Sequence, residues 1–196
     1  LFHTFAAMKY IALILLSSIL FTSCQPDIIQ EQPQWASVFK KYKIDSACFE
    51  LKDNNHDRIF YYNKNRMITR YCPASTYKIM NSLIALETNI APDENLVIPW
   101  DKVVRSRPEL NQDMDMRKAF EISSLPYYQE LARRIGAIDA QKWLDTVHYG
   151  NARIGPKVDE YWLNDTLKIS ADEQLGFMKK LYFDKLPFSA RSQRIV

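Results

Sequence analysis

Glycine is notably scarce in this sequence, with only 4 in 196 residues, against about 7% in average proteins. A glycine-rich loop that cradles phosphates therefore has almost nothing to be built from, which disfavours nucleotide-binding folds. An excess of one charge is also absent, because 26 Lys and Arg against 23 Asp and Glu leave a net charge of +3. That charge is too small to indicate a nucleic-acid partner. The three histidines, His3, His56 and His148, show no metal-ligand spacing, so the sequence predicts no metal site.

Long hydrophobic runs are missing as well, since the apolar segment from Tyr10 to Phe21 is shorter than the ~20 residues that span a bilayer. It follows Met8 and the charged Lys9 and is followed by small residues before Cys24. Residues 1–23 therefore resemble upstream residues plus a bacterial lipoprotein signal, cleaved so that the thiol of Cys24 carries lipid. An ordinary secretory signal with a coincidental cysteine is the alternative. Both predict export, and the first predicts a periplasmic, lipid-anchored protein that meets the membrane only through its lipid.

The rest of the chain has the composition of a globular protein, because 47% of the sequence is hydrophobic and 25% is charged. Residues 24–34 are polar and contain two prolines, which predicts a flexible tether. Residues 35–196 are predicted to form one folded domain. An exported compartment permits a disulfide between Cys48 and Cys72, but nothing in the sequence sets their distance, and two buried free thiols are the favoured interpretation.

The domain is predicted to begin with strands and to continue mainly as helices. Ser46–Leu51 and Arg58–Asn63 have the pattern of two strands, and the polar cluster Asp53–Asp57 between them predicts a hairpin turn. Thr76–Thr88 is almost entirely apolar, which predicts a helix buried in the core. Asn89 suits the left-handed position after that helix. Further helices are predicted at residues 126–135, 140–146 and 171–182.

A serine and a lysine stand three residues apart at the start of this apolar helix, in the motif Ser75-Thr76-Tyr77-Lys78. This spacing puts the hydroxyl and the amine on one helical face. Burial disfavours the charged ammonium, so Lys78 can act as a base toward Ser75. A capping serine beside a snorkelling lysine is the structural alternative. The bare spacing is weak evidence, because Ser37 and Lys40 repeat it in a predicted surface helix.

Two further segments give the motif a context. They are Ser123-Ser124-Leu125 and Tyr149-Gly150-Asn151, and Tyr161-Trp162-Leu163 follows them. With Pro-Ala-Ser-Thr-Tyr-Lys, in this order, the chain resembles the class D (OXA-type) serine β-lactamases from about Trp35 to Val196. The resemblance implies the α/β (α+β) fold of serine β-lactamases and penicillin-binding proteins, in which an antiparallel sheet and a helical lobe flank the active site.

The resemblance also implies a role for each matching residue. Ser75 would attack the β-lactam carbonyl, and Lys78 would be the base, carboxylated on its neutral amine by CO₂. Ser123 would relay a proton to the departing lactam nitrogen. Trp162 would donate its indole N–H to the lysine carbamate. CO₂ or bicarbonate would be needed for this modification, and no other cofactor is implied.

The supporting residues and the partners follow from the same resemblance. Leu125 stands where the family usually has Val and would keep the carbamate dry. Tyr149 and Asn151 would line the cleft and fix the geometry of its loops. The implied partners are β-lactam small molecules, penicillins first, while the oligomeric state stays open.

One family feature is absent, because no Lys-Thr-Gly or Lys-Ser-Gly triplet occurs in this chain. The resemblance places that strand beyond Val196, so we expect an incomplete reading frame whose C-terminal strands are missing. The seven residues before Met8 and the abrupt end at Val196 also suggest this. Two alternative functions stay open: a penicillin-binding sensor that remains acylated, which shares Ser-Thr-Tyr-Lys and Tyr-Gly-Asn, and a D,D-peptidase-like protein. An inert remnant is a third interpretation.

Overall fold

The computed structural model describes residues 28–196, so the predicted signal segment and Cys24 lie outside the described residues. The chain divides into two compact units. Of the described residues, the first unit holds 28–30 and Leu51–Phe60, and the second holds Glu31–Glu50 and Tyr61–Val196. All the predicted active-site residues belong to the second unit.

The predicted hairpin is present, as strands β2 (Phe49–Asp53) and β3 (Arg58–Tyr62). β2 begins three residues later than the sequence pattern predicted. The turn forms because the Asp53 carboxylate accepts hydrogen bonds from the backbone N–H of Asn55 at 3.0 Å and from Arg58 Nη2 at 2.9 Å. These bonds hold the pKa of Asp53 down at about 2, and the hydrogen bond from Arg58 is the largest cause.

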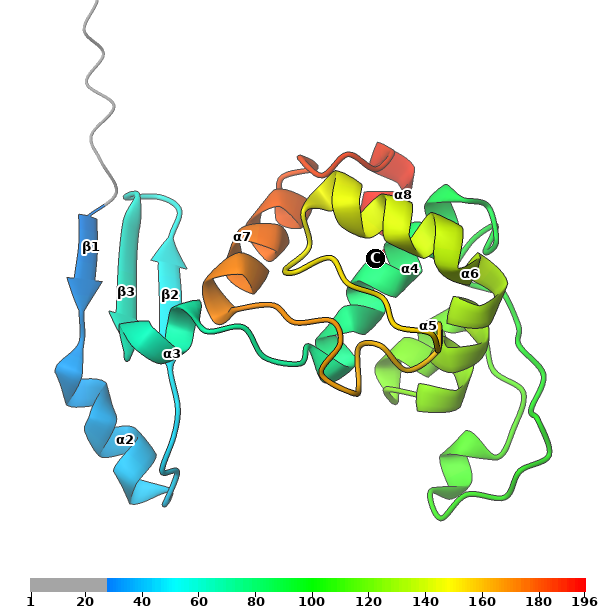
Figure 1. Cartoon of the computed structure of the whole chain (residues 1–196), viewed down its shortest axis with the longest axis horizontal. Helices are drawn as coiled ribbons and strands as arrows, with labels where there is room; N and C mark the ends of the chain where they lie inside the picture. Colours follow the sequence, from blue (N-terminus) through cyan, green and yellow to red (C-terminus); the bar gives the residue numbers. More distant parts are fainter. Residues whose placement is uncertain (1–27) are drawn as a thin grey trace, which may run out of the picture. The chain divides into compact units, whose positions relative to one another are not determined.

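A third strand corrects two predictions. β1 (Ile28–Glu31) occupies part of the segment predicted to be a flexible tether, and the order of the sheet is β1-β3-β2. The N–H of Ile28 donates to the carbonyl of Asp57 at 3.1 Å, and the N–H of Gln32 donates to the carbonyl of Tyr61 at 2.7 Å. Both partners advance by four residues, so β1 runs parallel to β3 (Figure 1). The sheet is therefore mixed, and not antiparallel throughout as predicted.

Helix α4 (Tyr77–Glu87) is the centre of the second unit and confirms the predicted buried helix. The 3-10 turn η2 (Ala74–Thr76) leads into it, and Asn89 ends it with φ 58°. Apolar side chains lie on nearly every face of this helix, so the helix gains its stability from burial. Figure 1 shows α4 inside the helical unit, where it packs against α6 (Leu125–Val147) and α8 (Ala190–Ile195).

The other predicted helices are present with clear local causes. α6 contains both predicted segments, 126–135 and 140–146, and Gly136 breaks its helical path with φ 76° and ψ 168°. α7 (Ala171–Tyr182) has the predicted bounds. It begins at a capping box in which the Glu173 N–H donates to Ser170 Oγ at 3.1 Å and the Ser170 N–H donates to Glu173 Oε2 at 2.9 Å. The remaining helical elements of the described residues are η1 (Pro33–Trp35), α2 (Ala36–Lys41), α3 (Lys64–Ile68), η3 (Pro108–Leu110) and α5 (Met116–Glu121).

The predicted α+β architecture is thus confirmed. Cys48 and Cys72 are free, as favoured, although both are half-buried and not fully buried. Between residues 28 and 196, no helix is both long and apolar enough to cross a membrane. Within the same residues, no group of three or more His, Cys, Asp or Glu side chains could hold a metal ion.

The C-terminal helix is fastened to α4 by one carboxylate. Glu87 accepts hydrogen bonds from the Ser189 N–H at 3.0 Å, from Ser189 Oγ at 2.8 Å and from Ser192 Oγ at 2.7 Å. Burial raises the pKa of Glu87, but the hydrogen bonds from Ser192 and Ser189 outweigh it, so the pKa is lowered overall. The contribution of this carboxylate to stability is therefore present above the unfolded pKa and is lost as pH falls through the folded pKa.

Replacing this carboxylate should destabilise the fold in a pH-dependent way. Glu87→Gln should lower the free energy of unfolding at pH 7 by about 1–2 kcal/mol, because hydrogen bonds to a charged group are lost. The difference from the parent should shrink below the ordinary Glu pKa of about 4.3. Urea titrations of the variant and the parent at pH 7 and pH 4 measure the difference in free energy of unfolding at each pH. Glu121→Gln is the control, because that exposed carboxylate only pairs with Lys118, and an equal loss there would contradict the assignment.

Candidate active site

Three predicted residues, Ser75, Lys78 and Ser123, come together in the second unit. Ser75 lies in the exposed turn η2, Lys78 in the first turn of α4, and Ser123 in the link between α5 and α6. Lys78 Nζ lies 2.9 Å from Ser75 Oγ and 3.0 Å from Ser123 Oγ. The Ser123 hydroxyl donates to Ser75 Oγ at 3.2 Å. The two hydroxyls and the amine form a closed triangle in which a proton can pass between any two members.

Local backbone geometry aims both serines. Ala74, just before Ser75, has φ 47°, and its N–H donates to the carbonyl of Trp162 at 3.1 Å. Ser123 has φ 55° and lies two residues after the end of α5, and its N–H donates to the carbonyl of Phe120 at 3.1 Å. Left-handed backbone is uncommon for residues with a Cβ and often marks functional positions. These two turns present Ser75 and Ser123 to the same amine.

The surroundings of Lys78 favour its neutral form. Its side chain is only 4% exposed. Burial lowers the pKa of Lys78, and the positive charge of Arg107 lowers it further. Arg107 is held near the site because its Nη2 donates to the carbonyl of Ile122 at 3.0 Å. A neutral amine can accept a proton from a serine hydroxyl, which is the requirement for a base at this position.

Trp162 is buried against the catalytic turn. Its carbonyl accepts hydrogen bonds from the Ala74 N–H and, at 2.8 Å, from Cys72 Sγ. Its ring stacks on Tyr77 at a centroid distance of 5.3 Å. Its Nε1 is buried and has no hydrogen-bond partner in the part of the chain that the structure describes. A buried unpaired donor is costly, so this N–H fits the predicted donation to an acceptor on the lysine.

Leu125 lies two residues after Ser123 in the chain. It is the first residue of α6 and is 37% exposed. The preceding Ser124 is buried and caps the helix by accepting a hydrogen bond from the Tyr127 N–H. The role of Leu125 in keeping water from the lysine stays a prediction.

Tyr149 and Asn151 separate into two structural roles. Tyr149 is buried in the core, and its hydroxyl donates to Gln174 Oε1 at 2.8 Å, while its place along the cleft stays a prediction. Asn151 fixes loop geometry as predicted. Its Nδ2 donates to the carbonyl of Thr166 at 2.9 Å, and its Oδ1 accepts from the Lys168 N–H at 2.9 Å.

The second serine–lysine motif is a surface feature, as expected. Ser37 and Lys40 are exposed on the short helix α2, and the Ser37 hydroxyl donates to the carbonyl of Gln34 at 2.7 Å. Because both residues are exposed, the pair is a natural control for the buried Lys78 and its serine.

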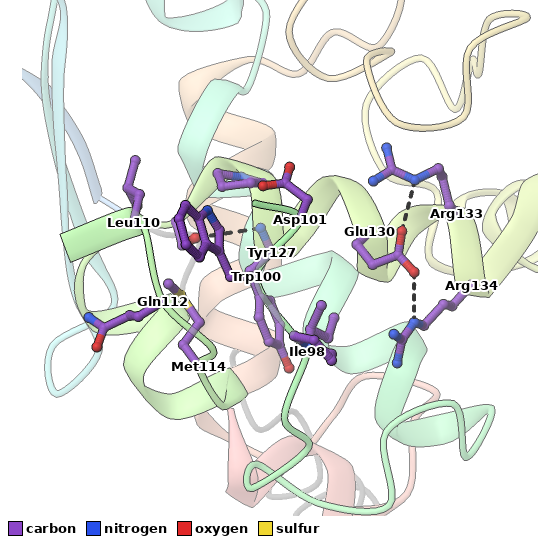
Figure 2. Close-up of a pocket in the computed structure, with 13 residues that line it drawn as sticks. Ile98, Trp100, Asp101, Leu110, Gln112, Met114, Tyr127, Glu130, Arg133 and Arg134 are labelled. Carbon is purple, nitrogen blue, oxygen red and sulfur yellow. Dashed lines mark hydrogen bonds and ion pairs between the residues drawn. The ribbon is translucent and has the colours of Figure 1, made fainter. Parts of the chain in front are cut away.

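A separate cavity of about 140 Å³ is lined by Ser124 and by residues of α6 and of the segment 98–114, and Figure 2 shows its lining. Ser75, Lys78 and Ser123 do not line it. Glu130 pairs with both Arg133 and Arg134 within one turn of α6 at its wall (Figure 2). Because its charged groups are already paired, this cavity offers little to an anionic substrate.

Sequence reasoning missed two features of the site. Arg107 acts on Lys78 only through space, and nothing in the pattern around it marks a site residue. The hydroxyls of Tyr77 and Tyr161 hydrogen-bond to each other beneath Trp162. Both tyrosines stand inside or beside the motif segments, which is the signal that could have pointed to them.

The fold and this site together define a serine enzyme or receptor of the penicillin-binding class. In agreement, residues 36–191 match the penicillin binding protein transpeptidase domain. β-Lactamase OXA-48 of Klebsiella pneumoniae is 41% identical over 167 residues, which cover 85% of this chain and 63% of that protein. The chain belongs to the class D β-lactamase family.

Solved structures agree with this membership. A class D β-lactamase from Sebaldella termitidis superposes with a TM-score of 0.81 at 31% identity, covering 86% of this chain and 68% of that one. The C-terminal domain of the Bacillus licheniformis BlaR penicillin-receptor also superposes with a TM-score of 0.81 at 31% identity, covering 87% of this chain and 68% of that one. The chain thus spans about two thirds of the length of these relatives.

Proposed function

We propose that this protein hydrolyses β-lactam antibiotics through an ester on Ser75. The observation that carries the proposal is the triangle of Ser75, Lys78 and Ser123, with the amine 2.9 Å and 3.0 Å from the two hydroxyls. Family membership supports the same reaction, since the similar proteins include β-lactamases.

The acylation half-reaction uses all three residues. Lys78 takes the proton of Ser75 while Ser75 Oγ forms a bond to the β-lactam carbonyl carbon. The carbonyl–nitrogen bond of the ring then breaks, and Ser123 passes a proton to the departing nitrogen from Lys78. The balance is an ester on Ser75 and an opened ring carrying the transferred proton. The lowered pKa of Lys78 supports the first step, because it keeps a fraction of the amine neutral.

Deacylation reverses the proton movements with water as the nucleophile. A water molecule gives a proton to the base at Lys78 while its oxygen attacks the ester carbonyl. The bond to Ser75 Oγ breaks, and the proton returns to Ser75. The acid product leaves and the enzyme is regenerated.

Carboxylation of Lys78 by CO₂ forms part of the proposal. The buried amine favours the neutral form that reacts with CO₂, and the unpaired Nε1 of Trp162 is a donor suited to a carboxylate oxygen. The group would supply a carboxylate base on the lysine that serves both half-reactions. Trp162 would hold its orientation by donating the indole N–H.

A penicillin sensor is the second candidate, and its supporting observation is the structural similarity to the BlaR receptor domain. The two functions share acylation and differ in deacylation. The sequence also carries Tyr77 between the catalytic serine and lysine, as sensors do.

The experiment that separates these functions counts turnovers. We expect benzylpenicillin to add its mass to the peptide that contains Ser75, and the adduct to decay while more than one equivalent of opened product accumulates. Intact-mass spectra over time and product quantification measure both. A persistent adduct without release of opened product would establish the sensor, and the absence of any adduct would contradict both functions.

Export is proposed on the strength of the N-terminal sequence. Residues 1–23 carry the pattern of a lipoprotein signal, so the mature protein would be periplasmic and anchored through lipid on Cys24. This location would bring the enzyme to the compartment that β-lactams enter.

A further inference from the structure

The hydroxyls of two buried tyrosines, Tyr77 and Tyr161, face each other in a cluster with the ring of Trp162, which we call the aromatic layer. Tyr77 is 0% exposed and Tyr161 is 1% exposed, and their hydroxyls share a hydrogen bond. Burial raises the pKa of both phenols, to about 12 for Tyr161, so both stay neutral. A buried hydroxyl costs free energy unless it is paired. Phenylalanine would fill the same space without that cost, so the pair calls for a use beyond packing.

The pair brackets the ring of Trp162. Tyr77 stacks on the indole with centroids 5.3 Å apart and planes at 26°. Tyr161 meets the same indole edge-on at 5.1 Å and 88°, and meets Tyr77 at 5.3 Å and 70°. Each of the three rings therefore contacts the other two. The hydrogen bond between the hydroxyls holds the two tyrosine rings in place against the indole.

The same contacts join two distant segments of the chain. Tyr77 is the residue before Lys78 on α4, whereas Tyr161 is the residue before Trp162 in the link between α6 and α7. The backbone of Trp162 is tied to the catalytic turn through its carbonyl. Carbonyl bonds leave the side-chain torsions of the indole free, so the flanking rings must set the direction of its N–H.

We propose that the Tyr77–Tyr161 hydroxyl pair is a positioning device that aims the Trp162 indole N–H at the modified amine of Lys78. The inference rests on the proposed function, in which Trp162 donates to a carboxyl group on that lysine. The tyrosines touch neither substrate nor the reacting atoms. Loss of the hydrogen bond lets the rings slide, and the indole N–H then spends less time in its donating orientation.

The test compares Tyr77→Phe, Tyr161→Phe and the double variant with the parent chain. Tyr127→Phe is the matched control, because Tyr127 is also buried and its hydroxyl donates to the carbonyl of Leu96 at 2.8 Å, outside the aromatic layer. Titration with ¹³C-bicarbonate, followed by ¹³C NMR of the lysine carbamate, measures the affinity for CO₂. Proton–nitrogen NMR of the Trp162 indole, assigned with Trp162→Phe, reports its orientation without any need for catalysis.

We expect each single variant to weaken CO₂ affinity by about two- to tenfold, the worth of one hydrogen bond. The double variant should be no weaker than the singles, because both changes break the same bond. The indole resonance should shift in the three variants and stay in place in Tyr127→Phe. An unchanged indole resonance in both single variants would overturn the inference. A parent chain without any carbamate signal would instead overturn the proposed lysine modification, and the indole spectra would still decide the positioning role.

Discussion

Ser75→Ala should abolish the covalent adduct with benzylpenicillin and lower the rate of β-lactam hydrolysis by about 10⁴-fold or more, as loss of the nucleophile does in other serine hydrolases. The physical reason is that no other hydroxyl in the triangle can replace the nucleophile. Ser123 Oγ lies 3.2 Å from Ser75 Oγ, and Ser123 belongs to a different turn with its own backbone direction. Intact-mass spectrometry after mixing with the drug, followed by peptide mapping, measures the loss.

Ser37→Ala is the internal control for this prediction. Ser37 has the same spacing to a lysine, but it is exposed and its hydroxyl is committed to the carbonyl of Gln34. Its variant should acylate at the parent rate. An adduct that still forms in Ser75→Ala, or one that is lost in Ser37→Ala, would show that Ser75 is not the nucleophile.

The second large effect concerns the base. Lys78→Gln should slow acylation by about 10²–10⁴-fold, the usual contribution of a positioned general base. Glutamine retains a polar end near both serines but cannot accept the proton of Ser75. Lys40→Gln, in the exposed motif, should leave the rate unchanged. Stopped-flow acylation kinetics with a chromogenic cephalosporin measure both, and equal rates for Lys78→Gln and the parent would remove Lys78 from the mechanism.

The pH dependence of the parent supplies a check on the same residue. Because the pKa of Lys78 is lowered by burial and then by Arg107, the neutral amine is populated below the ordinary lysine pKa of about 10.4. The acylation rate should therefore rise with pH and reach half its plateau below that value. Arg107→Gln removes the nearby positive charge, so the pKa of Lys78 should rise and the half-plateau should move to higher pH. If the pH profile of Arg107→Gln matches that of the parent, burial alone causes the lowered pKa of Lys78.

Within the family, these measurements distinguish an enzyme that hydrolyses β-lactams from a receptor that only binds them. β-Lactamases and the BlaR receptor domain are both similar to this chain, and acylation of Ser75 is common ground between the two functions. The two functions differ in the next step, which is the attack of water on the ester.

The sequence by itself determined the features that depend on neighbours in the chain. The capping box at Ser170 and Glu173 set the start of α7, and the apolar run after Ser75 predicted α4. The three-residue spacing of Ser75 and Lys78 already placed hydroxyl and amine on one helical face. Such features follow from local backbone geometry, which a short stretch of sequence specifies.

Only the tertiary structure decided the contacts made across long separations. Ser123 reaches Lys78 because α6 packs against α4. Tyr149 is buried in the core, which the Tyr-Gly-Asn motif by itself does not specify. The parallel course of β1 and the pairing of Tyr77 with Tyr161 likewise depend on segments that meet only after folding. Side-chain direction at such contacts is chosen by the packing of the whole core, and residue types and spacing along the chain do not specify it.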